Sequence, residues 1–305
     1  MYGLKRISVV YGAADRIIIN DDSKIVLMSD CHRGDGSHAD TFSKNKNIYY
    51  AALTRYYQED FVYIELGDGD ELWENKNMKD IIYVHKDVYA LLFSFYQKNR
   101  LHMLYGNHDI DKRRRQYLEN NLYQYFDTRK GEKIPLFPNI KIYEGLVLLH
   151  KPNNREIFLL HGHQADFLNG CLWRLAKVLV RYLWRPLELF GVNDPTSTAK
   201  NYKRKKSVED KLIKWLSDKD IIIIAGHTHR PVFPDTNEPR YFNDGSCVHP
   251  RCITAVEINK GYITLVKWSV KTKPDGTLYI GRDELAGPAR LSDYYRGGTY
   301  HINIT

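Results

Sequence analysis

The sequence has few cysteines and no long apolar run. These two absences argue against a disulfide-stabilised protein and against a membrane-spanning one. Its cysteines have no regular spacing and no Cys-x-x-Cys pair, which argues against a disulfide framework and a structural zinc site; they are Cys31, Cys171, Cys247 and Cys252. The most apolar stretch, residues 167–192, is interrupted by four cations and a glutamate, so it falls short of the roughly 18 apolar residues of a membrane span. Residues 1–16 contain no apolar core of signal-peptide length. We therefore expect a reduced, cytoplasmic setting.

The composition is that of an ordinary soluble globular protein, and 305 residues are enough for a large buried core. There are 45 Lys and Arg residues against 37 Asp and Glu residues, which gives a formal net charge of +8. This surplus favours anionic partners such as phosphates, nucleic acid or acidic lipid headgroups.

Five short apolar runs rich in β-branched residues organise the chain; they are residues 25–28, 61–64, 101–105, 157–160 and 221–224. Each run is too short for a free-standing helix and suits a strand that is buried on both faces. Between the first three runs, residues 45–58 and 79–98 have apolar side chains at helical spacing. Alternating strands and helices predict a parallel or mixed sheet in a layered α/β fold.

Other segments interrupt this alternation. Residues 140–160 are typical of a hairpin that turns at 152–154, and the chain after Gly261 is typical of a closing hairpin with a tail. Residues 164–216 are typical of a helical insertion that is broken around 191–195. We therefore expect three units: a core of residues 1–163 and 217–270, an insertion or cap of residues 164–216, and a tail of residues 271–305 that packs on the core.

Each apolar run is followed by residue types that can bind a metal ion. The motifs are Asp-x-His at 30–32, Gly-Asp at 67–68, Gly-Asn-His-Asp at 106–109, His-Gly-His at 161–163 and Gly-His-Thr-His at 226–229. Taken alone, an Asp-x-His is usually an ordinary loop and a His-Gly-His an ordinary turn. The carboxyl ends of the strands form the ligand crevice in open α/β sheets, so five such motifs together predict one shared site.

The residue types select the chemistry of this site. Carboxylate, imidazole and amide oxygen ligands suit Mn²⁺, Fe²⁺ or Zn²⁺ better than Ca²⁺. The motifs supply too many ligands for one ion and suit two ions that share a bridging carboxylate. Such a pair can hold a phosphoryl group and generate hydroxide from water. We expect two divalent metal ions as cofactors, with Mn²⁺ first and Fe or Zn as alternatives.

In this order, the five motifs resemble the signature blocks of the calcineurin-like metallophosphoesterases over about residues 24–250. The resemblance implies a four-layer α/β/β/α sandwich and a hydrolase that acts by attack of metal-bound hydroxide. It also implies a first metal on Asp30, His32 and His229, a second on Asn107, His161 and His227, and a bridge through Asp68.

The same resemblance assigns a catalytic role to His108, which follows the asparagine of the third motif. It would stabilise the phosphoryl group or protonate the leaving oxygen. A neighbouring acid, Asp70 or Asp109, would orient it.

Within the superfamily, the chain most resembles the UDP-diacylglucosamine pyrophosphatase branch of lipid A synthesis. The block at 67–73, Gly-Asp-Gly-Asp-Glu-Leu-Trp, is similar to that branch's Gly-Asp-Leu-Phe-Glu-x-Trp, and Arg-Pro follows the last motif at 230–231. The helical insertion lies where that branch has its lipid-binding lid. The chain departs from the branch at His108, where arginine is common, and at His163, where aspartate is common.

The insertion has two open interpretations. Residues 167–192 either pack an apolar face on the body with their arginines reaching water, or form an amphipathic cap that accepts an acyl chain or contacts the inner membrane surface. Basic clusters at 112–115 and 203–206 are either solvated faces or lie at the mouth of the site. The candidate substrate-binding residues are Arg113, Arg174, Arg181, Lys203 and Lys206.

These observations favour hydrolysis of a phosphoester or pyrophosphate bond in a lipid-linked or nucleotide-linked small molecule. The positive charge also permits a nuclease or nucleotide phosphodiesterase, although no nucleic-acid-binding module is recognisable. A protein phosphatase is less favoured because nothing marks a peptide groove. A non-catalytic scaffold is less favoured because every ligand position holds a competent residue.

Overall fold

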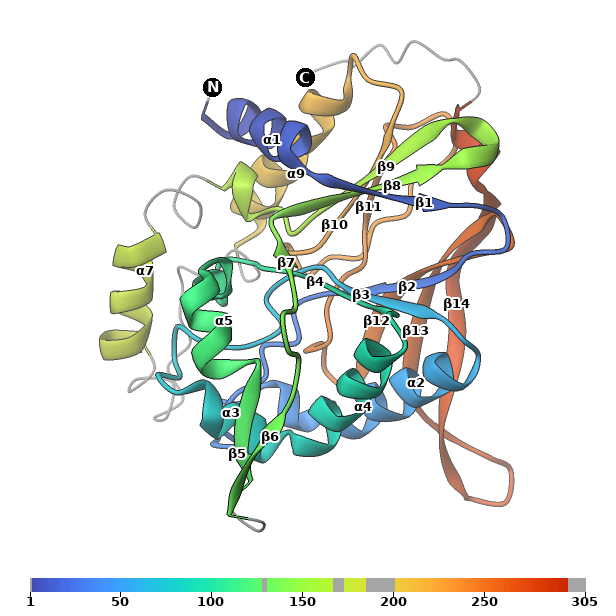
Figure 1. Cartoon of the computed structure of the whole chain (residues 1–305). Coiled ribbons are helices and arrows are strands. Elements are labelled where there is room, and N and C mark those ends of the chain that lie inside the picture. The colour runs from blue at the N-terminus through green and yellow to red at the C-terminus, as the bar shows by residue number, and fades with distance from the viewer. Residues whose placement is uncertain (1, 128–130, 167–172, 185–200, 296–305) are drawn as a thin grey trace.

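Two β-sheets face each other in the middle of the molecule, as Figure 1 shows for a computed structural model that describes residues 2–127, 131–166, 173–184 and 201–295. The first sheet has five strands in the order β1 (Asp15–Ile19), β8 (Gly145–His150), β9 (Arg155–Leu160), β10 (Ile222–Ala225) and β11 (Tyr241–Asn243). The second has seven, in the order β14 (Leu278–Arg290), β13 (Tyr262–Thr272), β12 (Cys252–Asn259), β2 (Lys24–Met28), β3 (Val62–Glu65), β4 (Leu101–Leu104) and β7 (Ile142–Tyr143).

Helices cover the outer face of each sheet. Helices α1 (Tyr2–Ala13) and α9 (Tyr202–Leu216) pack on the five-stranded sheet, and α2 (Lys46–Gln58) and α4 (Lys86–Gln97) on the seven-stranded sheet. Around the second sheet lie α3 (Met78–Val84), α5 (Arg115–Asn121) and a ribbon of β5 (Gln124–Asp127) and β6 (Glu132–Pro135). Short turns complete the described elements: η1 (Phe42–Lys44), η2 (Ile110–Arg113), η3 (Lys151–Asn153), η4 (His163–Ala165) and η7 (Leu291–Tyr295).

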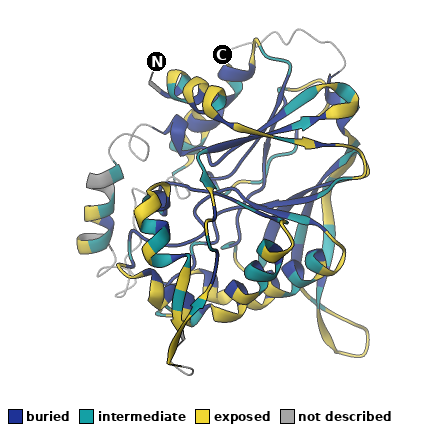
Figure 2. Ribbon diagram, viewed as in Figure 1, coloured by how far each residue is buried: buried dark blue, intermediate teal, exposed yellow. Residues whose placement is uncertain are grey.

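The alternation of side chains along the strands builds three apolar layers. In β10, Ile222 and Ile224 face the interior between the sheets, whereas Ile223 packs under α1 and α9. In β2, Leu27 faces the same interior, and Val26 packs under α2 and α4. Figure 2 shows both sheets as predominantly buried. The predicted four-layer α/β/β/α sandwich is therefore confirmed, because strands buried on both faces need helices outside and a second sheet inside.

All five predicted strands are present, but the predicted helix at 79–98 is interrupted. It consists of α3 and α4, which meet at His85, whose backbone has the non-helical angles φ −107° and ψ 30°. The His85 Nε2 atom lies 2.9 Å from Oδ2 of Asp40, and both side chains are fully buried. This tertiary contact explains the break, which the helical spacing could not show.

The hairpin predicted at 140–160 is formed by the antiparallel strands β8 and β9, with Asn154 in the left-handed region at the turn. The predicted tail of residues 271–305 begins with the end of β13 and contains the whole of β14, which pairs with β13. In η7, Leu291 and Tyr294 are buried in the interior between the sheets. Residues 296–305 lie outside the described residues.

The predicted insertion of residues 164–216 divides into two parts. Helix α9 buries Val208, Leu212 and Trp215 against the five-stranded sheet, so it belongs to the outer helical layer of the core and the predicted cap boundary at 216 lies too far along the chain. The remaining part, residues 173–184, comprises α7 (Trp173–Leu179) and the π-helical turn η5 (Val180–Trp184), and we call it the cap helix. It lies at the periphery beside α5 (Figure 1). Residues 167–172 and 185–200, with the predicted break at 191–195, lie outside the described residues.

Within the described residues, no helix has the length and apolar character needed to cross a bilayer.

Candidate metal centre

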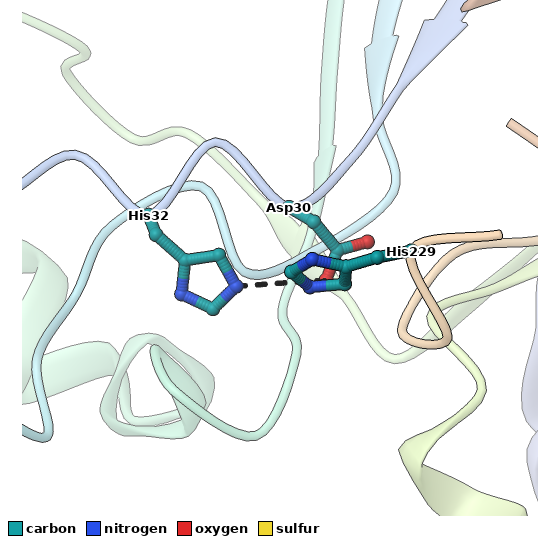
Figure 3. Close-up of side chains that lie close together, drawn as sticks. All are labelled: Asp30, His32 and His229. Carbon is teal, nitrogen blue, oxygen red and sulfur yellow. Dashed lines mark ion pairs between the residues drawn. The ribbon is translucent and has the colours of Figure 1, made fainter. Parts of the chain in front are cut away.

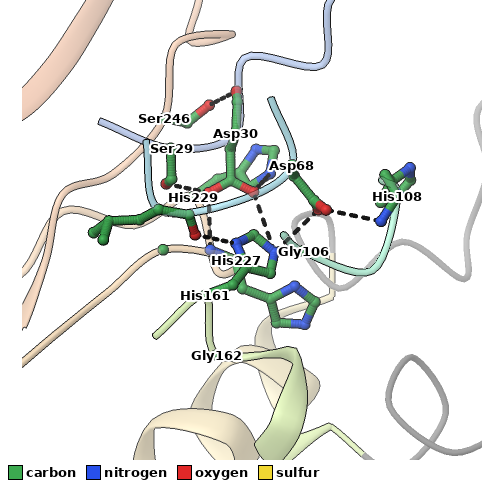
Figure 4. A network of polar contacts seen from close by, with 12 residues as sticks. Ser29, Asp30, Asp68, Gly106, His108, His161, Gly162, His227, His229 and Ser246 are labelled. Carbon is green, nitrogen blue, oxygen red and sulfur yellow. Dashed lines mark hydrogen bonds and ion pairs between the residues drawn. The ribbon is translucent and has the colours of Figure 1, made fainter. Parts of the chain in front are cut away.

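The five metal-binding motifs meet at one edge of the two sheets. Four of the preceding strands, β2, β3, β4 and β10, end two to four residues before the ligands, and β9 ends at the residue before His161. Strands β2, β3 and β4 are parallel neighbours in one sheet, and β9 and β10 are parallel neighbours in the other. Figure 4 shows side chains from all five segments converging. The fold thus brings together residues that are distributed from 30 to 229 in the sequence.

Several of the predicted ligands have an unusual backbone conformation. Five of them lie in the left-handed region: Asp30 (φ 51°), His32 (φ 48°), Asp68 (φ 49°), His227 (φ 69°) and His229 (φ 53°). Such residues cost about 1–3 kcal/mol each and persist where surrounding structure holds them, typically at functional sites. Here the two loops hold each other, because the N–H groups of Asp30 and His32 donate to the carbonyls of Gly67 and Asp68 at 3.1 and 2.9 Å.

The first group of side chains consists of Asp30, His32 and His229 (Figure 3). Oδ1 of Asp30 lies 3.0 Å from Nε2 of His229 and 3.7 Å from Nε2 of His32. Ligand atoms on one divalent ion are about 3 to 4 Å apart when each lies about 2 Å from the ion. These separations therefore fit three ligands of one metal.

The second group consists of Asp68, His161 and His227. Nε2 of His161 lies 3.1 Å from Oδ2 of Asp68, and the same Asp68 oxygen lies 3.9 Å from Nε2 of His32 in the first group. Asp68 therefore stands between the two groups, in the position predicted for a bridging ligand.

The remaining predicted ligand, Asn107, is only 1% exposed, and neither its side-chain oxygen nor its nitrogen has a hydrogen-bond partner among the described residues. Its neighbours on both sides contact Asp68, since the His108 N–H donates to Oδ1 of Asp68 at 2.8 Å and Gly106 packs directly against it. In the same part of the structure, Asp30 Oδ1, His32 Nε2 and His161 Nε2 also lack hydrogen bonds, because the nearby contacts do not have hydrogen-bond geometry. Buried polar atoms are normally paired, so this cluster is arranged to bind cations.

The sequence as a whole agrees with this geometry. The model of the family described as "Calcineurin-like phosphoesterase" matches residues 23–244. The chain belongs to this family. It is thus a metal-dependent phosphoesterase, and its divalent metals have candidate ligands in the two groups above.

No curated protein gives a significant match to this phosphoesterase. Among solved structures it is similar to Vps29 from Chaetomium thermophilum, at 12% identity and a TM-score of 0.37 over 87% of this chain and 96% of that one. It is also similar to a putative 5'-nucleotidase from Staphylococcus aureus in complex with alpha-ketoglutarate, at 13% identity and a TM-score of 0.33 over 92% of this chain and 56% of that one.

A third group, His32, Glu71 and His108, is held by hydrogen bonds. The Glu71 carboxylate lies 2.8 Å from Nδ1 of His32 and 2.7 Å from Nδ1 of His108. These separations are shorter than those expected for two ligands of one ion and suit N–H donors to a carboxylate. Glu71 therefore directs Nε2 of His32 towards the first metal group, and leaves Nε2 of His108 for another partner.

Glu71 is the acid beside His108, which corrects the expectation that Asp70 or Asp109 orients this histidine. Burial alone would raise the pKa of the Glu71 carboxyl, but the adjacent His108 and His32 lower it to about 2. The sequence contained one signal for Glu71, since it lies within the block at 67–73. Neither composition nor spacing could show that it contacts a histidine 37 residues away.

Asp70 and Asp109 are occupied in a buried ionic network beneath the site. Asp70 pairs with Arg33 at 2.7 Å and with Lys112 at 2.7 Å, and Lys112 also pairs with Asp109 at 2.7 Å. The Asp109 carboxylate accepts the N–H groups of Gly106 at 2.7 Å and Gly69 at 3.2 Å. Asp109 thereby connects the loop that carries Asp68 to the loop that carries Asn107. These contacts give Asp109 a structural role.

Further contacts fix the ligands themselves. The backbone N–H of His227 donates to Oδ2 of Asp30 at 2.8 Å, and the Ser29 hydroxyl donates to the same oxygen (Figure 4). Nδ1 of His161 lies 2.9 Å from the carbonyl of Leu66, which turns Nε2 towards Asp68. Such contacts set the tautomer and direction of metal-binding histidines.

The carboxylates and histidines of the site shift each other's pKa values. Burial would raise the pKa of Asp30, but His229 and His161 hold it well below its usual range. Burial would lower the pKa of His161, but Asp68 and Asp30 raise it to about 9. Without metal, a protonated His161 thus pairs with Asp68 and Asp30, so a cation and a proton compete for the same atoms.

The predicted substrate-binding residues do not form one group: Arg113 and Arg181 take part in contacts of the cap helix, and Lys203 and Lys206 lie on α9. Arg113 lies over the ring of Trp173 at 5.4 Å, and Arg181 donates to backbone carbonyls of residues 72–75. Lys203 and Lys206 are exposed on the first turns of α9. The side chain of Arg174 lies outside the described residues. None of these positions demonstrates a substrate contact, and Arg181 instead joins the cap helix to the loop that carries Glu71.

Proposed function

We propose that this phosphoesterase hydrolyses a phosphoester or pyrophosphate bond in a lipid-linked or nucleotide-linked small molecule, and we favour a lipid-linked one. The observation that carries the proposal is the position of His108 beside the two ligand groups. Its backbone N–H binds Asp68, and its side chain is 22% exposed at the rim. When bound, the two divalent ions supply charge neutralisation for the phosphoryl oxygens and activation of water.

Two side chains, Glu71 and Trp73, hold His108 in place for proton transfer. Glu71 holds His108 by Nδ1, so the histidine can present a proton on Nε2 to the leaving oxygen. The Trp73 ring stacks on His108 with centroids 4.2 Å apart and an interplanar angle of 23°, which restricts rotation of the imidazole. We propose Mn²⁺ as the metal because the ligand set combines carboxylates, imidazoles and an amide.

The cap helix supports a lipid-linked substrate. Val178, Leu179 and Tyr182 are 52%, 42% and 73% exposed, so this helix does not bury its whole apolar face on the body. An apolar face beside a phosphoesterase site suits an acyl chain or a peripheral membrane contact. By the same argument, the exposed Val178, Leu179 and Tyr182 are poorly suited to follow a nucleic-acid backbone, which needs cations. The net charge of +8 keeps a nucleotide phosphodiesterase as the second candidate.

The test compares three substrates at equal Mn²⁺: a UDP-linked diacyl lipid, a mononucleotide ester and single-stranded DNA. We expect the highest kcat/KM with the lipid and loss of turnover in Asp68→Ala. Val178→Ser with Tyr182→Ser should raise KM for the lipid and leave the mononucleotide ester unaffected. A higher kcat/KM for DNA or for the mononucleotide ester would replace the lipid assignment by the second candidate.

A further inference from the structure

The cap helix is fastened to the segment that holds His108. The Arg181 Nε atom donates to the Trp73 carbonyl at 2.9 Å, and Nη2 donates to the carbonyls of Leu72 at 2.7 Å and Asn75 at 3.4 Å. One guanidinium therefore binds three backbone carbonyls in the loop of residues 71–75. Arginine suits this task because it offers several donors in a fixed plane.

The loop of residues 71–75 is the support of His108. It supplies the Glu71 carboxylate, which accepts a hydrogen bond from Nδ1 of His108, and the Trp73 ring, which stacks on the imidazole. The Glu71 carboxylate is itself held by the Trp73 N–H at 3.1 Å, and the Asn75 side chain donates to the Glu71 carbonyl at 2.9 Å. A displacement of this loop would therefore move both contacts of the imidazole together.

The cap helix also contacts the chain that follows His108. Lys177 pairs with Asp111, and the Trp173 ring lies under the guanidinium of Arg113 at 5.4 Å. Asp111 and Arg113 belong to η2, which begins two residues after His108. Both Lys177 and Asp111 are largely buried, at 17% and 14% exposure of their side chains. The helix thus bridges two segments on either side of His108.

We propose that Arg181 of the cap helix is a positioning residue for His108, and so couples the cap to protonation of the leaving group. This inference rests on the proposed function, in which His108 donates that proton. Small errors in the position of a catalytic group cost about 100-fold in rate. The cap helix also carries the exposed Val178, Leu179 and Tyr182. The apolar part of a substrate that binds these side chains would therefore contact the same helix whose Arg181 positions His108.

The kinetic test uses Arg181→Gln and two phosphodiesters with Mn²⁺, one with a p-nitrophenyl and one with an alkyl leaving group. The alkyl ester needs a proton in the transition state, whereas the p-nitrophenyl ester does not. We expect Arg181→Gln to lower kcat for the alkyl ester at least tenfold with little change in KM, and to lower kcat for the p-nitrophenyl ester less than threefold. Arg181→Lys should recover part of the loss, since lysine can still donate to these carbonyls.

Two controls define the result. Arg115→Gln removes the same charge at a position that is 83% exposed, and it should leave both esters unchanged. His108→Ala should show the same leaving-group dependence as Arg181→Gln, only larger. Equal loss for the two esters in Arg181→Gln, or a change in KM alone, would overturn the positioning role. Absence of any metal-dependent turnover in the wild type would instead overturn the proposed function.

A second readout needs no metal. With ¹³C-labelled histidine in metal-free protein, the His108 Hε1 resonance should show the upfield shift of a proton over the Trp73 ring; it is assigned by its absence in His108→Ala. Arg181→Gln should move this resonance towards the shift of a free histidine, whereas Arg115→Gln should not. An unmoved resonance in Arg181→Gln, with normal thermal unfolding, would show that the cap does not hold the imidazole.

Discussion

At the scale of single residues, Glu71 serves two histidines with different tasks. Its carboxylate contacts Nδ1 of the candidate metal ligand His32 and Nδ1 of His108. Carboxylates that orient metal-binding histidines are worth about 10- to 100-fold in affinity or activity. In the proposed mechanism, these contacts connect metal binding to proton transfer through one side chain.

We predict that Glu71→Gln lowers both the affinity for metal and the rate of turnover, while it leaves the fold intact. The amide has the same size but loses the charge that attracts both N–H groups, so Mn²⁺ affinity and kcat on an alkyl phosphodiester should each fall about 10- to 100-fold. Metal titration and steady-state kinetics measure the two effects. Glu119→Gln, in an exposed helical pair with Arg115, is the matched control and should change neither. Unchanged metal affinity in Glu71→Gln would argue against the contact with His32.

Gly106 is required by close packing in the site. A Cβ atom at this position would lie 2.1 Å from Oδ1 and 2.6 Å from the backbone nitrogen of Asp68. We predict that Gly106→Ala displaces the bridging carboxylate and lowers phosphodiesterase turnover more than 100-fold, measured with matched total metal. Gly12→Ala adds the same methyl group where no atom lies within 4 Å, and it should be neutral. Full turnover in Gly106→Ala would show that Asp68 does not need its observed position.

Metal binding should release protons. Burial lowers the pKa of His161, but Asp68 and Asp30 raise it to about 9, so the metal-free imidazole is protonated at neutral pH. A metal binds only the neutral ring, so affinity should increase with pH until about 9 and decrease on acidification. Calorimetric titration with Mn²⁺ in buffers of different ionisation enthalpy measures the number of protons. A binding enthalpy that does not depend on the buffer would contradict this prediction.

At the scale of elements, the buried cation Lys112 joins the loop after β3 to the loop after β4. Lys112 is 1% exposed and lies 2.7 Å from both Asp70 and Asp109. Removing one member of a buried ionic network leaves uncompensated charge, which costs about 3–5 kcal/mol. The free energy of unfolding should therefore depend strongly on this side chain.

We predict that Lys112→Met lowers the free energy of unfolding in urea by about 3–5 kcal/mol. Arg114→Met, two residues further along, is the control, because Arg114 is 61% exposed and forms an ion pair with Asp111. It should change stability by less than about 1 kcal/mol. Equal stability of the two variants would mean that Asp70 and Asp109 tolerate the loss of their partner.

The strands were predictable because their signal is local. Runs such as 221–224 are too apolar and too short for anything but a buried strand, and the motif after each run follows directly in sequence. Contacts between distant residues had no such signal. The break at His85 depends on Asp40, and the contact between Glu71 and His108 depends on how two loops meet. Helix α9 resembled part of the insertion because its packing on β10 is visible only in three dimensions.

At the scale of the whole molecule, the sandwich explains why one site can be assembled from remote motifs. The apolar residues of β2, β3, β9 and β10 meet in the interior between the two sheets, so the carboxyl ends of these strands reach the same edge. The meeting of the seven candidate ligands at one edge could be predicted because every one of them follows such a strand end. The contacts between Arg181 and the loop of residues 71–75 could not be predicted, since they involve backbone carbonyls, which have no sequence signature.

The central claim is that the ends of the two sheets form a single centre for two metal ions, joined by Asp68. Its most direct test is the number of Mn²⁺ ions bound per chain, measured by titration and elemental analysis in the wild type and in Asp68→Asn. We predict two ions per chain in the wild type, and at most one in Asp68→Asn, with phosphodiesterase turnover reduced at least about 1000-fold. Binding of no divalent ion by the wild type, or two tightly bound ions in active Asp68→Asn, would contradict the account.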